Sequence, residues 1–314
     1  MSDTPLLRAE HLTKEFRTAG GAVHAVSDVS FEIYPGETLS RVGESGCGKS
    51  TLGRLLLRLI EPTSGRVTLD GRDVTTMKPR ELRAFRQNMQ LVFQDPYTSL
   101  DPRMTARRII AEPLRASGVP AREQEARVLG IARQVGVPEE FLSRYPHQFS
   151  GGQRQRIGIA RALVMQPKLV VCDEPVSALD VSIQAQILNL LHDLQAQYGA
   201  TYLFISHDLS VVRYISDRVA VMFLGKLCEV ASVDELYAHP RHPYTKFLLA
   251  ATPKLDPRQN TDDEELLTGE LPSPIHPPSG CRFRTRCPYA TQICADEAPA
   301  LQGDGHLLAC HHPL

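Results

Sequence analysis

A glycine-rich segment, GESGCGKST, has the residue types that hold a chain of phosphates. It runs from Gly43 to Thr51, fits G-x-x-x-x-G-K-[ST], and lies between a strand-like run and the helical pattern STLGRLLLRLI. Glycines let the backbone wrap so that its N–H groups and the helix N-terminus face the phosphates. Lys49 supplies a positive charge at the β- and γ-phosphates, and the Ser50 hydroxyl is a ligand for Mg²⁺.

We therefore predict a site for a nucleoside triphosphate in this loop. Cys47 lies near a helix N-terminus, which lowers thiol pKa values, but no neighbouring base is indicated and we interpret it as a small loop filler. The predicted phosphate-loop residues are Gly43, Glu44, Ser45, Gly46, Cys47, Gly48, Lys49, Ser50 and Thr51.

Two acidic residues follow a second apolar run, in KLVVCDEP. A carboxylate at the end of a strand beside a phosphate loop can hold Mg²⁺, the role we assign to Asp173, while Glu174 can polarise an attacking water. The next apolar run, TYLFIS, ends at His207, where ligands bind in open α/β sheets. A lone histidine there is more often structural, but its place after Lys49 and the acidic pair favours a site residue.

A third segment, FSGGQRQRIGIARAL, begins at Phe149 with a Ser-Gly-Gly turn that leads into a helix. A helix N-terminus with a serine cap is another phosphate-binding device, although an ordinary capped helix has the same pattern. Two such termini about a hundred residues apart cannot serve one γ-phosphate unless the second belongs to another subunit.

The composition is that of an ordinary globular protein, with 42% hydrophobic and 23% charged residues in 314. The net charge of −1 gives no electrostatic case for nucleic acid or an anionic membrane surface. No signal peptide is visible, and no run approaches the roughly 18 apolar residues that span a bilayer. Any membrane role is therefore expected to come through a partner. Seven cysteines without an export signal argue against a disulfide scaffold.

The elements that must position these motifs alternate between strands and helices. Strand-like runs cover residues 22–34 and 36–42, a mainly helical pattern covers 79–164, and apolar runs then alternate with helical ones. This order predicts an α/β fold with a parallel sheet. Residues 251–280 are rich in proline and acid and are expected to form an extended connector. Arg41 lies in a strand expected to be buried, so it needs an acidic partner or a less buried strand.

Six motifs in a fixed order resemble an ATP-binding subunit of an ATP-binding cassette (ABC) transporter. They are GESGCGKST, VFQDP with Gln94, FSGGQ, LVVCDEP, SALD and ISHD, and they cover roughly residues 10–240. Two positions depart from the family pattern. Phe149 stands where leucine is most frequent in the signature, and Arg41 stands where an aliphatic residue is usual.

The resemblance implies an α/β fold of the ABC-type P-loop NTPase class, with a RecA-like core, an antiparallel β subdomain and a helical signature subdomain. It implies a nucleotide-binding domain over residues 1–250, with the helical subdomain at about 95–165. A small cysteine-rich extension over 251–314 is expected to follow.

The resemblance also implies a role for each site residue in a head-to-tail nucleotide sandwich. Glu174 would be the general base, and His207 would hold the γ-phosphate. Gln94 would sense Mg²⁺ and water, and Phe16 would stack on adenine, with core packing as the alternative for that ring. The Mg²⁺ ligands would be Ser50, Gln94 and Asp173. The D-loop contributes Asp180, and the signature residues acting on the partner's ATP would be Ser150, Gly151, Gly152 and Gln153.

Four of the cysteines lie in the last 34 residues, with spacing C-x5-C-x6-C-x15-C. Structural zinc sites usually have close C-x2-4-C pairs, whereas four thiolates are the usual ligands of a [4Fe–4S] cluster. Three arginines, at positions 282, 284 and 286, offset the cluster's negative charge. A zinc site that includes His306, His311 or His312 stays open on the residues alone, as do unligated thiols or disulfides. The proposed ligands are Cys281, Cys287, Cys294 and Cys310.

The tail also resembles the carboxyl-terminal extension of oligopeptide and dipeptide permease ATPases, most closely the second ATPase subunit of those systems. This resemblance implies the [4Fe–4S] cluster and an ATPase that powers import of di- or oligopeptides. The implied partners are a paralogous ATPase in a heterodimer, two membrane permeases and an extracytoplasmic solute-binding protein. The implied location is the cytoplasmic face of the plasma or inner membrane, where the permeases hold the chain.

Two other functions are weighed against peptide import. A soluble ABC ATPase of DNA repair or translation would usually carry a long coiled-coil insertion or two cassettes, and neither pattern is present. An iron–sulfur redox enzyme would need a second cofactor motif, which the sequence does not contain. The transported molecule itself is not encoded in this subunit.

Overall fold

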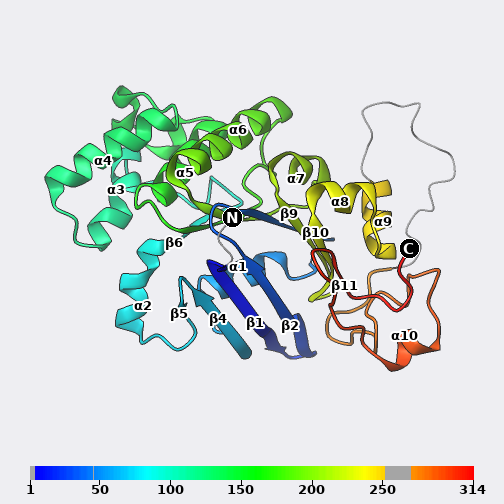
Figure 1. Ribbon diagram of the computed structural model, residues 1–314. Helices are drawn as coiled ribbons and strands as arrows, with labels where there is room; N and C mark the ends of the chain where they lie inside the picture. Colours follow the sequence, from blue (N-terminus) through cyan, green and yellow to red (C-terminus); the bar gives the residue numbers. More distant parts are fainter. Residues whose placement is uncertain (1–3, 45, 252–269) are drawn as a thin grey trace. The chain divides into compact units, whose positions relative to one another are not determined.

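The computed structural model (Figure 1) describes residues 4–44, 46–251 and 270–314. These residues divide into two compact units. The first unit comprises Met1–Leu6, Ile33–Glu37 and Thr76–Ile205, and the second comprises Leu7–Glu32, Thr38–Thr75 and Ser206–Leu314. No helix in these described ranges combines the length and the apolar composition needed to cross a bilayer. The domain division at residue 250 and the helical subdomain at 95–165 stay predictions.

Parallel strands carry the acidic pair of the first unit. The order is β8 (Thr201–Ile205), β7 (Leu169–Asp173), β6 (Met89–Val92), with Asp173 paired to Ile205. Every residue of β7 and β8 is buried, as expected for parallel strands covered on both faces. The helical pattern predicted for residues 79–164 is wrong for β6, because four residues are too few to establish a period and the strand depends on pairing with β7.

Helices of the first unit begin and end at residues that satisfy their free backbone groups. Helix α3 starts after Thr105, whose hydroxyl accepts from the N–H of Arg108, and α6 ends at Gly199 with φ of 63°. Helices α3, α4 and α5 pack against one another through apolar faces. The helical elements are α2 (Pro79–Phe85), η1 (Arg86–Asn88), α3 (Ala106–Ala116), α4 (Ala121–Gln134), η2 (Glu139–Ser143), η3 (Pro146–Gln148), α5 (Gly151–Leu163) and α6 (Val181–Tyr198).

A four-stranded sheet in the second unit supports the helix that follows the phosphate loop. The strand order is β2 (Gly21–Ile33), β1 (Leu7–Thr18), β4 (Ser64–Leu69), β5 (Arg72–Asp73), and β4 is antiparallel to both neighbours.

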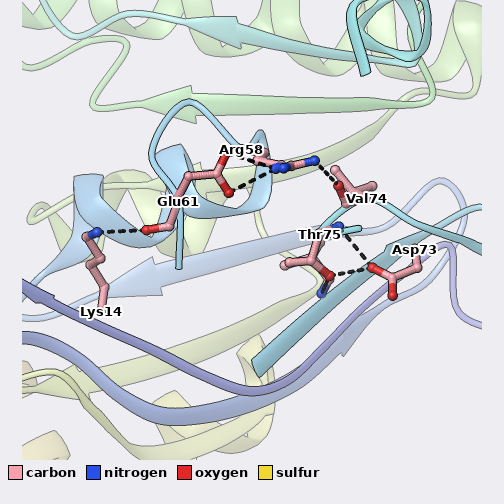
Figure 2. Close-up of polar contacts among 7 residues, drawn as sticks. Lys14, Arg58, Glu61, Asp73, Val74 and Thr75 are labelled. Carbon is pink, nitrogen blue, oxygen red and sulfur yellow. Dashed lines mark hydrogen bonds and ion pairs between the residues drawn. The ribbon is translucent and has the colours of Figure 1, made fainter. Parts of the chain in front are cut away.

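Polar contacts join that sheet to the segment after helix α1 (Lys49–Leu56). Arg58 Nη1 donates to the Val74 carbonyl at 3.1 Å, and its Nε donates to the Glu61 carboxylate (Figure 2). Lys14 on β1 donates to the Glu61 carbonyl at 2.7 Å. These hydrogen bonds attach the segment after α1 to β1 and to the residue that follows β5.

The second unit also contains strands in the order β11 (Leu307–Leu308), β10 (Lys226–Ser232), β9 (Arg218–Phe223), β3 (Thr38–Val42). Strand β3 is parallel to β9, while β10 is antiparallel to β9 and β11. Its remaining helices are α7 (Leu209–Ile215), α8 (Val233–Ala238), α9 (Pro243–Ala250) and α10 (Gln292–Asp296).

The carboxyl-terminal tail is part of this unit and not an appendage to it. Strand β11 pairs with β10, as Figure 1 shows, and the Ala309 N–H donates to the Cys228 carbonyl at 2.8 Å. The Phe283 side chain is buried in the apolar cluster that contains Phe223, Tyr244 and Phe247. Most of the connector expected over 251–280 lies outside the described residues.

Candidate nucleotide-binding site

The phosphate loop connects the end of β3 to the start of α1, as the sequence predicts. Gly48 has φ of 94°, and a Cβ atom there would lie 2.0 Å from the Ala25 carbonyl oxygen, so only glycine fits. Lys49 Nζ donates to the carbonyls of Gly43 at 2.6 Å and Glu44 at 3.0 Å. The ammonium group therefore lies within the loop. Ser45 lies outside the described residues.

The loop runs directly into the first turn of α1. Ser50 and Thr51 occupy the first turn of α1 and are half-buried. Cys47 is buried, and its sulfur lies 2.9 Å from where a Cβ on Gly43 would be. This packing inside the loop agrees with the interpretation of Cys47 as a filler.

Arg41 is buried on strand β3, so the alternative of a less buried strand is wrong. Its side chain is 1% exposed, and its Nη1 donates to the carbonyls of Lys49 at 2.7 Å and Gly48 at 3.2 Å. These carbonyls lie at the junction of the loop and α1. The guanidinium thus ties the strand to the start of the helix, which an aliphatic side chain cannot do.

The predicted adenine-stacking residue lies at the surface of the second unit. Phe16 is 38% exposed on β1, and Lys14 Nζ lies 5.0 Å from the centre of its ring. A ring packed in the core would be almost fully covered. This exposure favours stacking over core packing for Phe16.

The structure brings together the predicted base and the glutamine of the VFQDP motif, 80 residues apart in the chain. Gln94 Nε2 donates to Glu174 Oε2 at 2.8 Å. Glu174 follows β7 with φ of 45°, and its N–H donates to the Ile205 carbonyl at 3.0 Å. A non-glycine residue in the left-handed region is strained, and such strain is concentrated at functional sites. Asp173, the last residue of β7, directly precedes Glu174 in the chain and is buried.

The signature segment forms the capped helix start that the sequence predicts. The Ser150 hydroxyl accepts from the Gln153 N–H at 3.3 Å, and the Gln153 side chain accepts from the Ser150 N–H at 3.0 Å. Ser150 is exposed, and Gly152 lies so close to Ile183 that a Cβ would be 2.6 Å from its Cγ2. Phe149 is buried in place of the usual leucine, with its ring edge against Phe141.

The last two motifs lie at helix starts. Asp180 is the N-cap of α6 and accepts from the Ile183 N–H at 3.4 Å. His207 is exposed and precedes Asp208, which caps α7 through the N–H groups of Ser210 and Val211. The capping of α7 fixes the backbone next to the histidine.

The four tail cysteines all lie in the second unit, spread over 30 positions of the chain. The Cys281 N–H donates to the Cys294 carbonyl at 2.8 Å. Burial raises the pKa of Cys310 to about 11, and the thiolates of Cys281, Cys287 and Cys294 add to that increase. All four are free thiols. Within the described residues, no three histidine, cysteine or acidic side chains surround a single point as ligands of one ion do.

Each histidine considered as a zinc ligand has another partner. His306 Nε2 lies 2.6 Å from the buried Glu229 carboxylate, whose oxygens also accept from the N–H groups of Arg241 and His242. His311 bonds to the Glu297 carbonyl, and His312 bonds to the Thr291 hydroxyl at 2.7 Å. These contacts argue against the three histidines as zinc ligands.

Two contacts to the phosphate loop could not be predicted from the sequence. The Tyr244 hydroxyl accepts from the Glu44 N–H at 2.9 Å, and Arg286 Nη1 donates to the Glu44 carboxylate at 2.8 Å. Tyr244 and Arg286 lie 200 and 242 positions from Glu44 in the chain. No local pattern relates residues so distant in the chain.

Comparison with known proteins places these features in a family. Residues 26–177 match the family model described as ABC transporter, and residues 228–294 match that described as oligopeptide/dipeptide transporter, C-terminal region. The chain resembles the dimeric, post-hydrolysis ATP-binding cassette MJ0796 bound to ADP and Pi, with a TM-score of 0.66 and 30% identity. That likeness covers 72% of this chain and 98% of the other.

Relatives along the whole length are similar as well. A Brucella ovis protein named for peptide import and ATP binding is 52% identical over 99% of this chain and 98% of its own. The oligopeptide transport ATP-binding protein AppF of Bacillus subtilis is 52% identical, covering 94% and 92% of the two chains. The predicted fold class is confirmed by these matches. The chain belongs to the ABC transporter family, among its ATP-binding ATPases with an oligopeptide/dipeptide transporter C-terminal region.

Proposed function

We propose that this chain binds and hydrolyses ATP to power the import of di- or oligopeptides through a membrane ABC transporter. The observation that carries the proposal is the presence, in one chain, of a complete set of nucleotide motifs and the oligopeptide/dipeptide C-terminal region. A soluble ABC ATPase of DNA repair or translation has the first feature and no need for the second.

The binding step uses the residues of the phosphate loop. Loop N–H groups and the Lys49 ammonium attract the β- and γ-phosphates, exchanging the loop carbonyls that Lys49 now contacts for phosphate oxygens. Phe16 stacks on the adenine. The residues that would hold Mg²⁺ are Ser50, Gln94 and Asp173, whose oxygens suit a hard cation. When bound, Mg²⁺ neutralises charge that develops on the phosphates.

The hydrolysis step depends on the acidic residue after β7. Glu174 accepts a proton from the attacking water, and Gln94, which donates to one of its oxygens, orients the carboxylate. The same hydrogen bond links the base to the glutamine segment that faces the permease in this family. His207 contacts the γ-phosphate and positions the water.

The signature acts on a nucleotide held by another ATPase subunit. Ser150 is exposed at the start of α5, where its hydroxyl and the Gly151 and Gly152 N–H groups can meet a phosphate. We propose that the partner is a paralogous ATPase, of which this chain is the second-subunit type. The Asp180 loop lies in the same interface.

The other proposed partners are two transmembrane permeases, which hold the chain at the cytoplasmic face of the membrane, and an extracytoplasmic solute-binding protein. The test is purification of the tagged chain from membranes in mild detergent, followed by ATPase assays. We expect two hydrophobic permeases to copurify and peptide-loaded binding protein to stimulate ATP turnover. A chain that elutes without permeases, and whose ATPase ignores binding protein, would contradict the import function.

We further propose that Cys281, Cys287, Cys294 and Cys310 hold a [4Fe–4S] cluster. The Cys281 N–H donates to the Cys294 carbonyl, and the nearby histidines have other partners. Zinc needs four ligand atoms about 2.3 Å from one centre, whereas a cluster accepts thiolates spread around a larger body. Cys294 is buried, and the other three cysteines are half-buried.

The prediction is that the chain purified without oxygen is brown and contains equal amounts of iron and acid-labile sulfide. Cys294→Ser is expected to lose the colour, because it removes one of four ligands. Cys228→Ser is the matched control, since Cys228 is buried in the same unit and lies outside the proposed set. A colourless wild-type protein with bound zinc would overturn the assignment.

A further inference from the structure

Three side chains contact Glu44, the second residue of the phosphate loop. Its N–H donates to the Tyr244 hydroxyl at 2.9 Å, its carbonyl accepts from Lys49 at 3.0 Å, and its carboxylate accepts from Arg286 at 2.8 Å. Only Lys49 belongs to the loop motif. Tyr244 comes from α9, and Arg286 comes from the cysteine-bearing tail.

The tail segment that carries Arg286 is fixed by aromatic packing. Phe283 is 1% exposed, with its ring centre 5.2 Å from that of Tyr244 and 5.3 Å from that of Phe223. The Arg286 side chain is only 7% exposed. Close packing leaves such side chains few alternative positions, so the guanidinium is presented to Glu44 in a defined place.

A second arginine of the tail supports the loop from its other end. Arg282 Nη2 donates to the Ser27 hydroxyl at 2.9 Å, and its Nη1 donates to the Leu224 carbonyl. The next residue, Gly225, donates its N–H to the Cys47 carbonyl at 3.1 Å. The tail therefore contacts the loop directly, through Arg286, and indirectly, through the turn at Leu224 and Gly225.

The ion pair between Arg286 and Glu44 reduces electrostatic repulsion between the loop and its ligand. A carboxylate in a loop that binds a polyphosphate repels its ligand, and the repulsion is strong where water is partly excluded. Arg286 offsets the Glu44 charge and holds the side chain in one place. The loop therefore loses less conformational entropy when the nucleotide binds, and this raises the affinity for the nucleotide.

We propose that Arg286 is a positioning residue for nucleotide binding, and that through its contact with Glu44 the state of the cysteine-bearing tail sets the ATP affinity of the phosphate loop. The proposal deepens the ATPase function proposed above and rests on it. Cys287 is the neighbour of Arg286, so ligation of that cysteine restrains the guanidinium. A restraint shared by two sites couples their binding free energies reciprocally.

The first test measures binding of the fluorescent analogue mant-ATP, with Mg²⁺, to the full-length chain. Arg286→Met keeps most of the packing stem and is expected to weaken mant-ATP binding about tenfold. Arg284→Met is the matched control, because Arg284 is also near the cysteines but its guanidinium donates to Ser279 and not to Glu44. Equal affinities of the two variants would overturn the proposal.

A double-mutant cycle with Glu44→Gln isolates the charge pair. With the carboxylate gone, Arg286 has no charge to offset, so Glu44→Gln/Arg286→Met is expected to bind mant-ATP within about threefold of Glu44→Gln alone. A full tenfold loss in both backgrounds would show that Arg286 acts without Glu44 and would overturn the mechanism.

A second pair of variants guards against misfolding. Tyr244→Phe removes the hydroxyl that accepts from Glu44 and keeps the ring in the core. Tyr237→Phe removes a comparable hydroxyl bonded to the Leu209 carbonyl. Weaker mant-ATP binding by the first variant alone supports the proposal, and unchanged binding by both contradicts it.

The coupling step rests on the metal centre proposed above and is tested without turnover. Anaerobic removal of the metal is expected to weaken mant-ATP binding in the wild type and to have a smaller effect in Arg286→Met. Equal effects in both proteins would overturn the coupling. A wild-type chain that never binds mant-ATP would refute the ATPase function itself, so the two failures are distinguishable.

Discussion

Glu174→Gln is expected to lower the rate of ATP hydrolysis about 10²- to 10⁴-fold, the range typical for loss of a general base. Glutamine has nearly the same shape, so the strained backbone and the contact with Gln94 are retained. Its amide cannot accept a proton from water at neutral pH. ATP affinity should therefore change little, and the loss should appear in kcat.

The measurement is phosphate release by the purified transporter complex, together with mant-ATP binding to the same preparation. Glu123→Gln is a suitable control, because Glu123 forms an exposed ion pair with Arg127 on α4 in the same unit. Hydrolysis by Glu174→Gln at the wild-type rate would refute Glu174 as the base.

Gly48→Ala is expected to lower the free energy of unfolding by about 3 to 5 kcal/mol and to abolish nucleotide binding. The new methyl group would lie 2.0 Å from a backbone oxygen of Ala25, and φ of 94° is unfavourable for alanine. A backbone atom cannot move aside as a flexible side chain can. The loop must therefore shift, and its N–H groups lose their common direction.

Urea unfolding of the variant and of Gly71→Ala separates steric overlap from the cost of positive φ. Gly71 lies in the β4–β5 turn with φ of 71° and has open space where a Cβ would be. Its substitution should cost only about 1 to 2 kcal/mol. Equal losses of unfolding free energy in the two variants would mean that the contact with Ala25 is not the reason why position 48 requires glycine.

The nucleotide motifs could be predicted from the sequence because each is local. A glycine loop between a strand and a helix, or a serine cap with glutamine three residues later, is determined by backbone sterics and hydrogen bonds over a few residues. The loop before α1 and the capping pair of Ser150 and Gln153 therefore lie where their patterns indicate.

Other features depended on contacts between distant parts of the chain. Strand β6 was hidden in a helical pattern, because a strand of four residues is stabilised by its neighbour and not by its own period. The sequence alone indicated an unfavourable buried charge at Arg41. The structure shows that its guanidinium donates to the carbonyls of Lys49 and Gly48.

The chemical groups of this protein can be identified from local sequence patterns: a phosphate loop, an acidic pair, a signature helix and a thiol-rich tail. The contact between Gln94 and Glu174 and the ion pair between Arg286 and Glu44 arise only when the chain is folded. The reason is physical. Local motifs follow from the conformations open to a few residues, whereas contacts across 80 or 242 positions exist only when sheets and cores pack as a whole.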